Sequence, residues 1–566
     1  MTPRIGGTLA EYEAEALATG AADEFPRDLD LDKVRIDVGQ HDLTALTNLC
    51  WEAIKKQNGD ETAGIAPRLF LFNGLIVRAV KEDGGRLKIE AVTIDILGHA
   101  LDSWAHWYSF KKIGKEYAEV PAFPSERVLR NVLATPEPEL PVLRRIVSVP
   151  VFTSDGRLNL KPGFDWRSGI YYWPTGSFVA ESVPDVIGQE QLDFARKVLC
   201  EELLLDFPFA EPVGYQHADR DNAIALAVLG AVREMIGGST PNHAIEASIR
   251  SAGKGKLARA LAGIFAGEEL ASTPPLENET DWKRLITSKL YTGAPVLLVD
   301  NIERPLRSAS LASAWTEPFW EDIVFHKQTT NRVPVRTIWI TTANNMVMHE
   351  DLMTRSIRIR LEPKTSKPED RTGFRHDDLD LWCRDNRNVL VWAVHVLVLW
   401  WMQQGRPAPT KIRSTRHAEW CRVVGGILSA AGFNDFLGNQ VEFQHNAAQG
   451  VDAAAAFCSQ WWFERGEIPE GQKAHRPTPA AKLLEIARKV DDFPITENKD
   501  GQTRAMGLWL NSVRDRHIES EEDLKHRRIR RMYVIRRHPT YVKGSRPWLL
   551  ERVGDDEDIG EARGDE

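Results

Sequence analysis

The pattern of apolar and polar positions changes along the chain, and each change indicates a different kind of structure. Near the start, short apolar runs alternate with turn signals such as Asn73-Gly74 and Asp83-Gly84-Gly85. The apolar runs lie at 69–72, 75–80 and 87–92. Such runs joined by such turns are typical of a β-meander. A helical pattern near 96–104, strand-like aromatic residues near 170–173 and a helix near 190–205 complete a predicted α+β domain.

From Asp219 the pattern alternates between helix and strand. A helix at 219–236 precedes an apolar run, a glycine-lysine turn and another helix, and three short strands follow at 296–300, 335–341 and 356–361. This alternation predicts an α/β sheet covered by helices. A long buried helix is expected at 379–402, because its longest apolar stretch is shorter than the about 18 residues that indicate a membrane span. We therefore expect no membrane partner.

The last part of the chain combines two short helices, at 480–490 and 506–516, with a basic strand-like segment. This order predicts a winged-helix-like module with its wing near 534–550. The expected organisation is a mobile leader at 1–35, an α+β domain at 36–210, an α/β domain at 211–405, a helical region at 406–468, the winged-helix-like domain at 469–553 and a disordered acidic tail at 554–566.

Composition narrows the functional classes. The 566 residues include 72 Lys and Arg against 81 Asp and Glu, a formal charge of −9. A chain this acidic does not coat nucleic acid, so any DNA contact must come from a local basic patch. The five cysteines are spaced singly, which excludes a zinc ribbon and favours a reducing, cytoplasmic location.

The candidate chemistry begins with the glycine-lysine turn SIRSAGKGKLARAL at 248–261. It lies between an apolar run and a helix, where backbone N–H groups and a helix N-terminus can hold phosphates. Aligned with G-x-x-x-x-G-K-[ST], Ser248 replaces the first glycine and Gly255 replaces the hydroxyl that ligates Mg²⁺. The alternative is a loop without a ligand. The expected ATP-binding residues are Ser251, Ala252, Gly253, Lys254, Gly255 and Lys256.

Two further strands end in polar residues. Asp300 ends the run VLLVD and is followed by Asn301. An acid at the end of a buried strand is the arrangement that holds Mg²⁺ beside phosphates. Asn344 ends another strand, where it can orient a water or hold the γ-phosphate, since ligands of open α/β sheets bind at the carboxyl edge. Arg355 follows, near Arg358 and Arg360. The alternative for Asp300 is an ordinary strand end, and that for Asn344 is a turn former. The alternative for the arginines is solvated charge at the edge of the sheet.

The order of these segments resembles that of the AAA+ helicase-type ATPases of phages, plasmids and integrative elements. They are related to superfamily-3 helicases and to the C-terminal regions of primase-helicases. The similarity covers about 192–436 and rests on GKGKLARAL, VLLVDN, TTANN, DLMTRSIRIRL, FRHDDL, DNRNVLV and WWMQQGRP. It implies ATP and Mg²⁺ as cofactors and a ring, usually hexameric. It also implies a P-loop lysine (Lys254), a metal-binding acid (Asp300) followed by an amide (Asn301), a sensor (Asn344) and an arginine finger acting on a neighbouring subunit (Arg355).

The chain departs from this family at two places. The Mg²⁺ hydroxyl is absent at Gly255, and 320–326 lacks the arginine and glycine of W-x-x-R-x-L-G. Weak ATP hydrolysis is therefore expected on an AAA+ P-loop fold.

DNA binding is predicted at the densest basic run, KHRRIRRMYVIRR at 525–537. Its arginines are Arg527, Arg528, Arg530, Arg531, Arg536 and Arg537. The alternative is a basic strand pair that balances the acidic tail. A primase site is not expected, since the acids of DLDLD lie in the leader, so a primase or initiator would be a separate partner.

Three functions follow from these observations. The first is an oligomeric DNA-dependent ATPase, helicase-like, in the replication of a mobile genetic element. The second is a nucleotide-binding or nucleotide-blind DNA-binding scaffold or initiator. The third is an ATPase of an anti-phage defence system.

Overall fold

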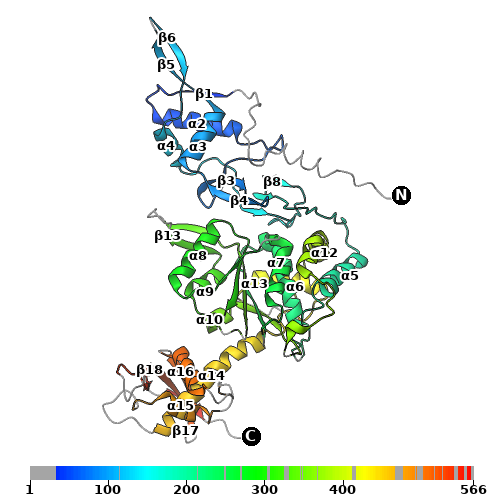
Figure 1. Cartoon of the computed structure of the whole chain (residues 1–566), viewed down its shortest axis with the longest axis vertical. Helices are drawn as coiled ribbons and strands as arrows, with labels where there is room; N and C mark the ends of the chain where they lie inside the picture. The colour runs from blue at the N-terminus through cyan, green and yellow to red at the C-terminus, as the bar shows by residue number, and fades with distance from the viewer. Residues whose placement is uncertain are drawn as a thin grey trace. The chain divides into compact units, whose positions relative to one another are not determined.

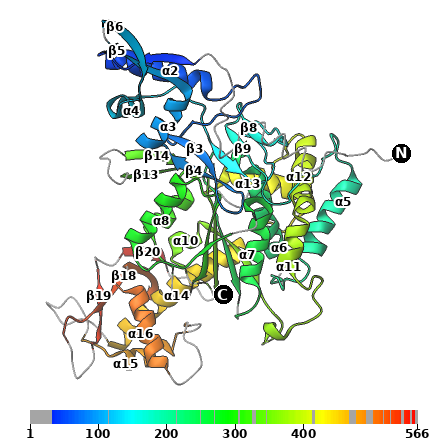
Figure 2. The same ribbon diagram turned by 45° about the horizontal axis from the view of Figure 1, so that its top comes forward.

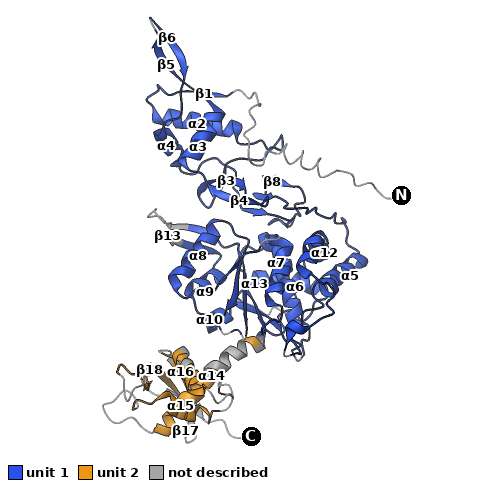
Figure 3. Ribbon diagram, in the orientation of Figure 1, with its two compact units in different colours: residues 1–440 blue, residues 441–566 orange. Residues whose placement is uncertain are grey.

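The computed structural model forms two compact units, residues 1–440 and 441–566 (Figure 3). It describes residues 33–561 apart from 114, 213, 248–249, 268–269, 303–305, 324–329, 345, 347, 366, 411–415, 466–475, 491–492, 494–500, 515–516, 525–526, 541–545 and 554–556. Residues 1–32 of the expected leader lie outside the described part. The boundary between the units falls within the expected helical region, where α14 (Gln440–Arg465) begins.

The N-terminal part of the first unit contains the predicted meander (Figure 1). Its strands are β2 (Phe70–Phe72), β3 (Leu75–Lys81) and β4 (Leu87–Ala91). A second small sheet has the order β1-β5-β6 and packs with three helices around buried Leu97, Leu101 and Val132. These elements are β1 (Val34–Asp37), β5 (Ala105–Ile113), β6 (Glu116–Pro121), α2 (Leu43–Gln57), α3 (Ile94–Trp104) and α4 (Glu126–Leu133). The third sheet has the order β7-β9-β8 and comprises β7 (Arg145–Val147), β8 (Gly163–Asp165) and β9 (Ile170–Tyr172).

The centre of the first unit is a five-stranded parallel sheet with the order β11-β12-β15-β10-β16. Its strands are β10 (Asn242–Ala247), β11 (Ser272–Thr273), β12 (Val296–Ile302), β15 (Ile338–Asn344) and β16 (Ser356–Leu361). Every residue of β10 is buried, as expected for a parallel strand covered on both faces. The α/β sheet predicted from the alternating pattern is therefore present.

Helices cover both faces of this sheet. Figures 1 and 2 show α8 (Glu279–Tyr291) on one side and α6 (Ala218–Val232) and α7 (Lys254–Ala266) on the other. A smaller antiparallel pair, β13 (Phe319–Ile323) and β14 (Thr330–Pro334), follows α9 (Ala309–Thr316). Ahead of α6, α5 (Gln189–Lys197) continues as a π-helical segment, Val198–Leu203.

A buried polar network ties α6 to β16. Asn222 donates to the Arg358 carbonyl over 2.9 Å, and the backbone N–H of Arg360 donates to Asp219 over 2.7 Å. Asn439 also donates to Asp219, over 2.8 Å. Arg358 itself is only 2% exposed, so the alternative of a solvated edge charge is wrong for this arginine. The edge of the sheet is closed by hydrogen bonds to α6.

The predicted long helix is two helices, α11 (Leu379–Asp385) and α12 (Arg387–Gln403). They are separated by Asn386, whose side chain donates to the Trp382 carbonyl and so competes with helix continuation. In α12, the ring of His395 hydrogen-bonds the Pro150 carbonyl over 3.0 Å, and burial lowers its pKa to about 4. α12 is a core helix. None of the described helices combines the length and apolar character that crossing a membrane requires.

The second unit places helices against a four-stranded sheet. Its helices are α14, α15 (Ala480–Ala487) and α16 (Gln502–Val513), and their core includes Phe457, Trp461 and Tyr533. The strands are β17 (His517–Leu524), β18 (Arg527–Arg537), β19 (Trp548–Arg552) and β20 (Glu557–Glu561). β18 pairs with all three others. The first predicted helix ends earlier than expected, at Ala487, the second begins earlier, at Gln502, and part of the expected disordered tail forms β20.

α6 and α7 approach so closely at Gly230 that a side chain does not fit. A Cβ on Gly230 would lie 2.1 Å from Cδ1 of Phe265. We expect Gly230→Ala to destabilise the first unit by about 1–3 kcal/mol through overpacking, measured by urea unfolding. Gly263→Ala on α7 is the matched control, because its Cβ would meet nothing within 4 Å. Equal effects of the two substitutions would contradict this account of the helix contact.

Candidate functional site

The turn between β10 and α7 has the backbone of an anion-binding loop. Gly253 adopts φ 92° and Ser251 adopts φ 61°, both in the left-handed region. These two residues turn the chain sharply so that α7 begins at Lys254, directly after the carboxyl end of β10. A helix N-terminus in this position offers unpaired backbone N–H groups and a positive dipole end to a phosphate. Ser248 and Ile249 lie outside the described residues.

Lys254 is the lysine of this turn that points inward. It is 9% exposed, and its Nζ donates to Oδ1 of Asn344 over 2.5 Å. Burial lowers the pKa of Lys254, and the nearby Asp300 carboxylate opposes that shift. Lys256, two residues later, is exposed. The structure therefore brings Lys254, Asn344 and Asp300 together, as the sequence predicts.

Asp300 is held by a threonine that is not among the residues predicted from the sequence. Thr342 donates its hydroxyl to Oδ1 of Asp300 over 2.5 Å, and the same hydroxyl accepts the backbone N–H of Asn301 over 2.9 Å. Asn301 has φ 61° where the register of β12 shifts. Thr342 and Asn344 are two residues apart on β15, so they share one face of the strand. That spacing in TTANN is the signal that points to Thr342.

These groups line a cleft of about 1160 Å³ at the carboxyl edge of the sheet. Ligands of open parallel sheets bind at this edge. The cleft is large enough for a nucleotide, because small-molecule sites usually span about 300–1,000 Å³. The predicted residues that line it are Ser251, Ala252, Gly253, Lys254, Gly255, Lys256, Asp300 and Asn301. Asn344 lies next to the cleft through its contact with Lys254.

Part of the cleft lining is aromatic and cationic. The Arg371 guanidinium lies 4.9 Å from the ring centre of Phe374 and is also paired with Asp206 over 3.0 Å. Phe207 approaches the glycine-lysine turn, since a Cβ on Gly253 would lie 3.4 Å from it. Rings and a guanidinium can stack on a base. Phe374 begins the segment FRHDDL, to which the sequence alone gives no role.

The residues present do not complete the expected Mg²⁺ site. Mg²⁺ requires octahedral oxygen ligands, and P-loop proteins supply a hydroxyl and an acid. Gly255 supplies no hydroxyl, and Asp300 has one oxygen engaged by Thr342. Within the described ranges, no three His, Cys, Asp or Glu side chains gather to hold a metal. The expected ligand Asp300 therefore stands without its usual partner.

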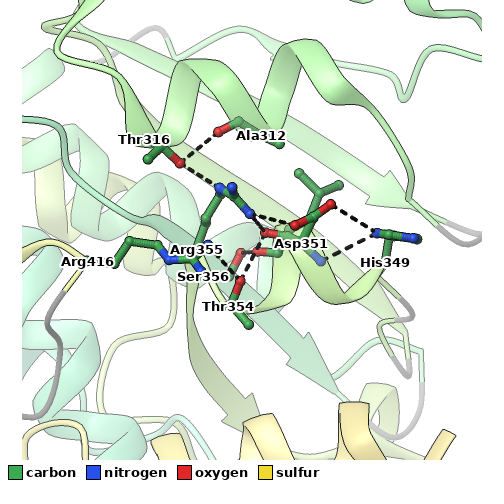
Figure 4. A network of polar contacts seen from close by, with 9 residues as sticks. Ala312, Thr316, His349, Asp351, Thr354, Arg355, Ser356 and Arg416 are labelled. Carbon is green, nitrogen blue, oxygen red and sulfur yellow. Dashed lines mark hydrogen bonds and ion pairs between the residues drawn. The ribbon is translucent and has the colours of Figure 1, made fainter. Parts of the chain in front are cut away.

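Arg355 lies at the other end of the sheet. It precedes β16, whose first residue pairs with the first residue of β10, and its carbonyl accepts the backbone N–H of Asn242. Six residues of strand separate this amino edge from the carboxyl edge, roughly 20 Å at about 3.3 Å per residue. The Arg355 side chain donates to Thr316 over 2.5 Å and pairs with Asp351, on α10 (Glu350–Met353), over 3.1 Å (Figure 4). The structure thus separates Arg355 from the cleft that Lys254 and Asp300 line in its own chain.

The predicted DNA patch lies on β18, between acidic neighbours. In the register of the sheet, Glu521 and Glu557 flank Arg530 on opposite sides, and Asp523 lies opposite Arg528. The side chains of Arg527, Arg528 and Arg530 are outside the described part. The remaining candidates are Arg531, which is half-buried, Arg536, which pairs with Glu551 over 2.5 Å, and Arg537, which lies 4.5 Å from the Trp548 ring centre. The basic run is therefore partly balanced within its own sheet.

Comparison with solved structures finds similarity at low identity. The chain is similar to the A-form apo structure of the NrS-1 C-terminal region, with 11% identity, 86% of this chain and 96% of that chain covered, and a TM-score of 0.32. The SCCmec type IV Cch active helicase is 12% identical, with 82% of this chain and 84% of that chain covered and a TM-score of 0.29. The JCV helicase is 13% identical, with 45% of this chain and 73% of that chain covered and a TM-score of 0.19. No protein-family profile and no curated protein sequence matches the chain.

The arginines of β18 and the acids opposite them allow two variants whose effects on DNA affinity should be opposite. Replacing Arg527, Arg528, Arg530 and Arg531 by alanine should flatten the dependence of DNA affinity on salt, by about 0.9 in log–log slope for each phosphate that is no longer neutralised. The matched variant, Glu521→Gln with Asp523→Asn, should raise affinity, because it removes the acids opposite the arginines. Fluorescence anisotropy of a labelled duplex measures both. An unaltered slope in the arginine variant would exclude this patch as the DNA site.

Proposed function

We propose that the chain binds a nucleoside triphosphate in this cleft and acts as an oligomeric, DNA-dependent, helicase-like ATPase in the replication of a mobile element. The observation that carries the proposal is the buried Lys254 at the start of α7, in contact with Asn344 and close to Asp300. Asp300 and Asn344 lie on the neighbouring parallel strands β12 and β15, and Lys254 begins the helix that follows β10.

The charge arrangement supports phosphate binding. The Lys254 ammonium donates to an uncharged amide, while Thr342 holds Asp300. A buried cation without a hydrogen-bonded carboxylate retains its attraction for an anion, and the low dielectric of the site strengthens that attraction. In the proposed reaction, Lys254 holds the terminal phosphates, Asn344 positions the attacking water, and the aromatic wall near Phe207 takes the base.

Slow turnover is part of the proposal. Without a hydroxyl at Gly255 the usual metal-ligating pair is incomplete, so the chain should retain nucleotide better than it hydrolyses it. The same feature favours the second candidate function, a DNA-binding replication scaffold that is switched by nucleotide binding alone. DNA-stimulated release of phosphate separates the two, since only the first function requires it.

The nucleotide site is tested by removing the Lys254 charge. Lys254→Ala should weaken binding of labelled ATP about 10- to 100-fold, the loss expected for a hydrogen bond to a charged group. Lys283→Ala, on the exposed face of α8, is the control and should bind as the unaltered protein does. Equal binding by all three proteins in equilibrium dialysis would refute the nucleotide site.

The position of Arg355 motivates a shared site between subunits. At the amino edge of its own sheet it lies far from its own P-loop, and a neighbour in a ring is the remaining way for it to reach a phosphate. Arginines supplied in trans stabilise charge on the transferred phosphoryl group.

Mixing two inactive variants tests this arrangement. Arg355→Ala and Lys254→Ala should each lack ATPase activity, whereas their mixture should recover part of it, because some interfaces then combine an intact lysine with an intact arginine. Sedimentation of the mixture checks assembly. Assembled mixtures without recovered phosphate release would argue against the shared site, and a protein that never assembles with nucleotide or DNA would point to the scaffold.

A further inference from the structure

An arginine side chain covers the place where the metal-ligating hydroxyl is missing. Gly255 lies in the first turn of α7, and Arg259 lies one turn later on the same face. A Cβ on Gly255 would lie 3.4 Å from Nη1 of Arg259 and 3.9 Å from both Cζ and Nη2. Long side chains on a helix point back toward its N-terminus, which is how Arg259 reaches the phosphate-facing end of α7.

This guanidinium is not committed elsewhere. Among the residues that the structure describes, Arg259 has neither an ion pair nor a hydrogen bond, and it is exposed to the cleft that Lys254 and Asp300 line. The other arginines that line the cleft differ, since Arg371 is paired with Asp206 and Arg220 is paired with Asp221. Arg259 is therefore a cation available to a ligand of the cleft.

We propose that Arg259 binds the nucleotide phosphates in the place that Mg²⁺ takes in other P-loop proteins, so that this chain binds the metal-free nucleoside triphosphate. The inference rests on the proposed nucleotide site and specifies the form of its ligand. A guanidinium carries a permanent charge and donates two parallel N–H bonds to a phosphate. It also repels a divalent cation placed beside it.

The absence of a side chain at Gly255 is part of the proposed phosphate site. The guanidinium lies against the first turn of α7, where a Cβ at position 255 would be in ordinary van der Waals contact with it and the further atoms of a threonine would crowd it. At 3.4 Å, a new Cβ would touch only the flexible end of Arg259, so Gly255→Thr fits once the guanidinium swings away. The hydroxyl and the guanidinium thus compete for one position.

The experiment measures binding of mant-ATP in excess EDTA and in excess Mg²⁺, with fluorescence as the readout. The unaltered chain should bind with similar affinity under both conditions. Arg259→Ala should lose about 10- to 100-fold of its affinity in EDTA, and Arg259→Lys should recover part of that loss. Arg284→Ala, an exposed arginine on α8 outside the cleft, serves as the control and should lose nothing.

A reciprocal variant gives the opposite result. Gly255→Thr combined with Arg259→Ala restores the hydroxyl and removes the guanidinium, so its binding of mant-ATP should become dependent on Mg²⁺.

These measurements distinguish a failure of the role proposed for Arg259 from a failure of the nucleotide site. If EDTA abolishes binding to the unaltered chain, or Arg259→Ala binds normally in EDTA, the role of Arg259 is refuted while the nucleotide site stands. If Lys254→Ala binds mant-ATP normally under both conditions, the nucleotide site itself is refuted.

Discussion

The contact between Lys254 and Asn344 is the interaction on which the candidate site depends. A lysine that is 9% exposed must have a polar partner, and the partner here is an uncharged amide on the adjacent strand. That contact exists only because β15 lies between β10 and β12 in the sheet. The same strand contributes Thr342, which holds Asp300. One strand therefore supplies the partners for both the positive and the negative group, and any shift in its register would separate them together.

Charge is distributed unevenly around the cleft. Elsewhere in the cleft lining, arginines are matched by carboxylates, as in Arg371 with Asp206. At the start of α7, by contrast, Lys254 contacts an amide and Arg259 extends into the cleft. Paired charges fix the shape of a wall without attracting an ion, whereas unmatched ones generate a field. An anion entering this cleft is drawn toward the helix N-terminus.

The sequence predicted elements whose pattern is local and missed features that are set by individual side-chain contacts. The meander, the strands β10, β12, β15 and β16, and the glycine-lysine turn follow from short-range periodicity and turn chemistry. The burial of Arg358 does not, because it depends on α6 closing over the sheet edge. The break at Asn386 is a side-chain hydrogen bond inside an otherwise helical pattern. Likewise, nothing near Gly255 in the sequence states that Arg259 folds back over it, and the roles assigned to Asn301 and Arg355 remain predictions.

In the second unit, the last described strand, β20, completes the pairing of β18. β18 is paired along 527–534 by β17 on one side, and along 527–530 and 533–537 by β20 and β19 on the other. The backbone of its most highly charged residues is thus satisfied on both sides, and no edge is left there for another chain to extend. Removing β20 would uncover a row of main-chain donors and acceptors beside four consecutive residues that include three arginines. A chain shortened before β20 would therefore offer these main-chain groups for pairing with an added strand.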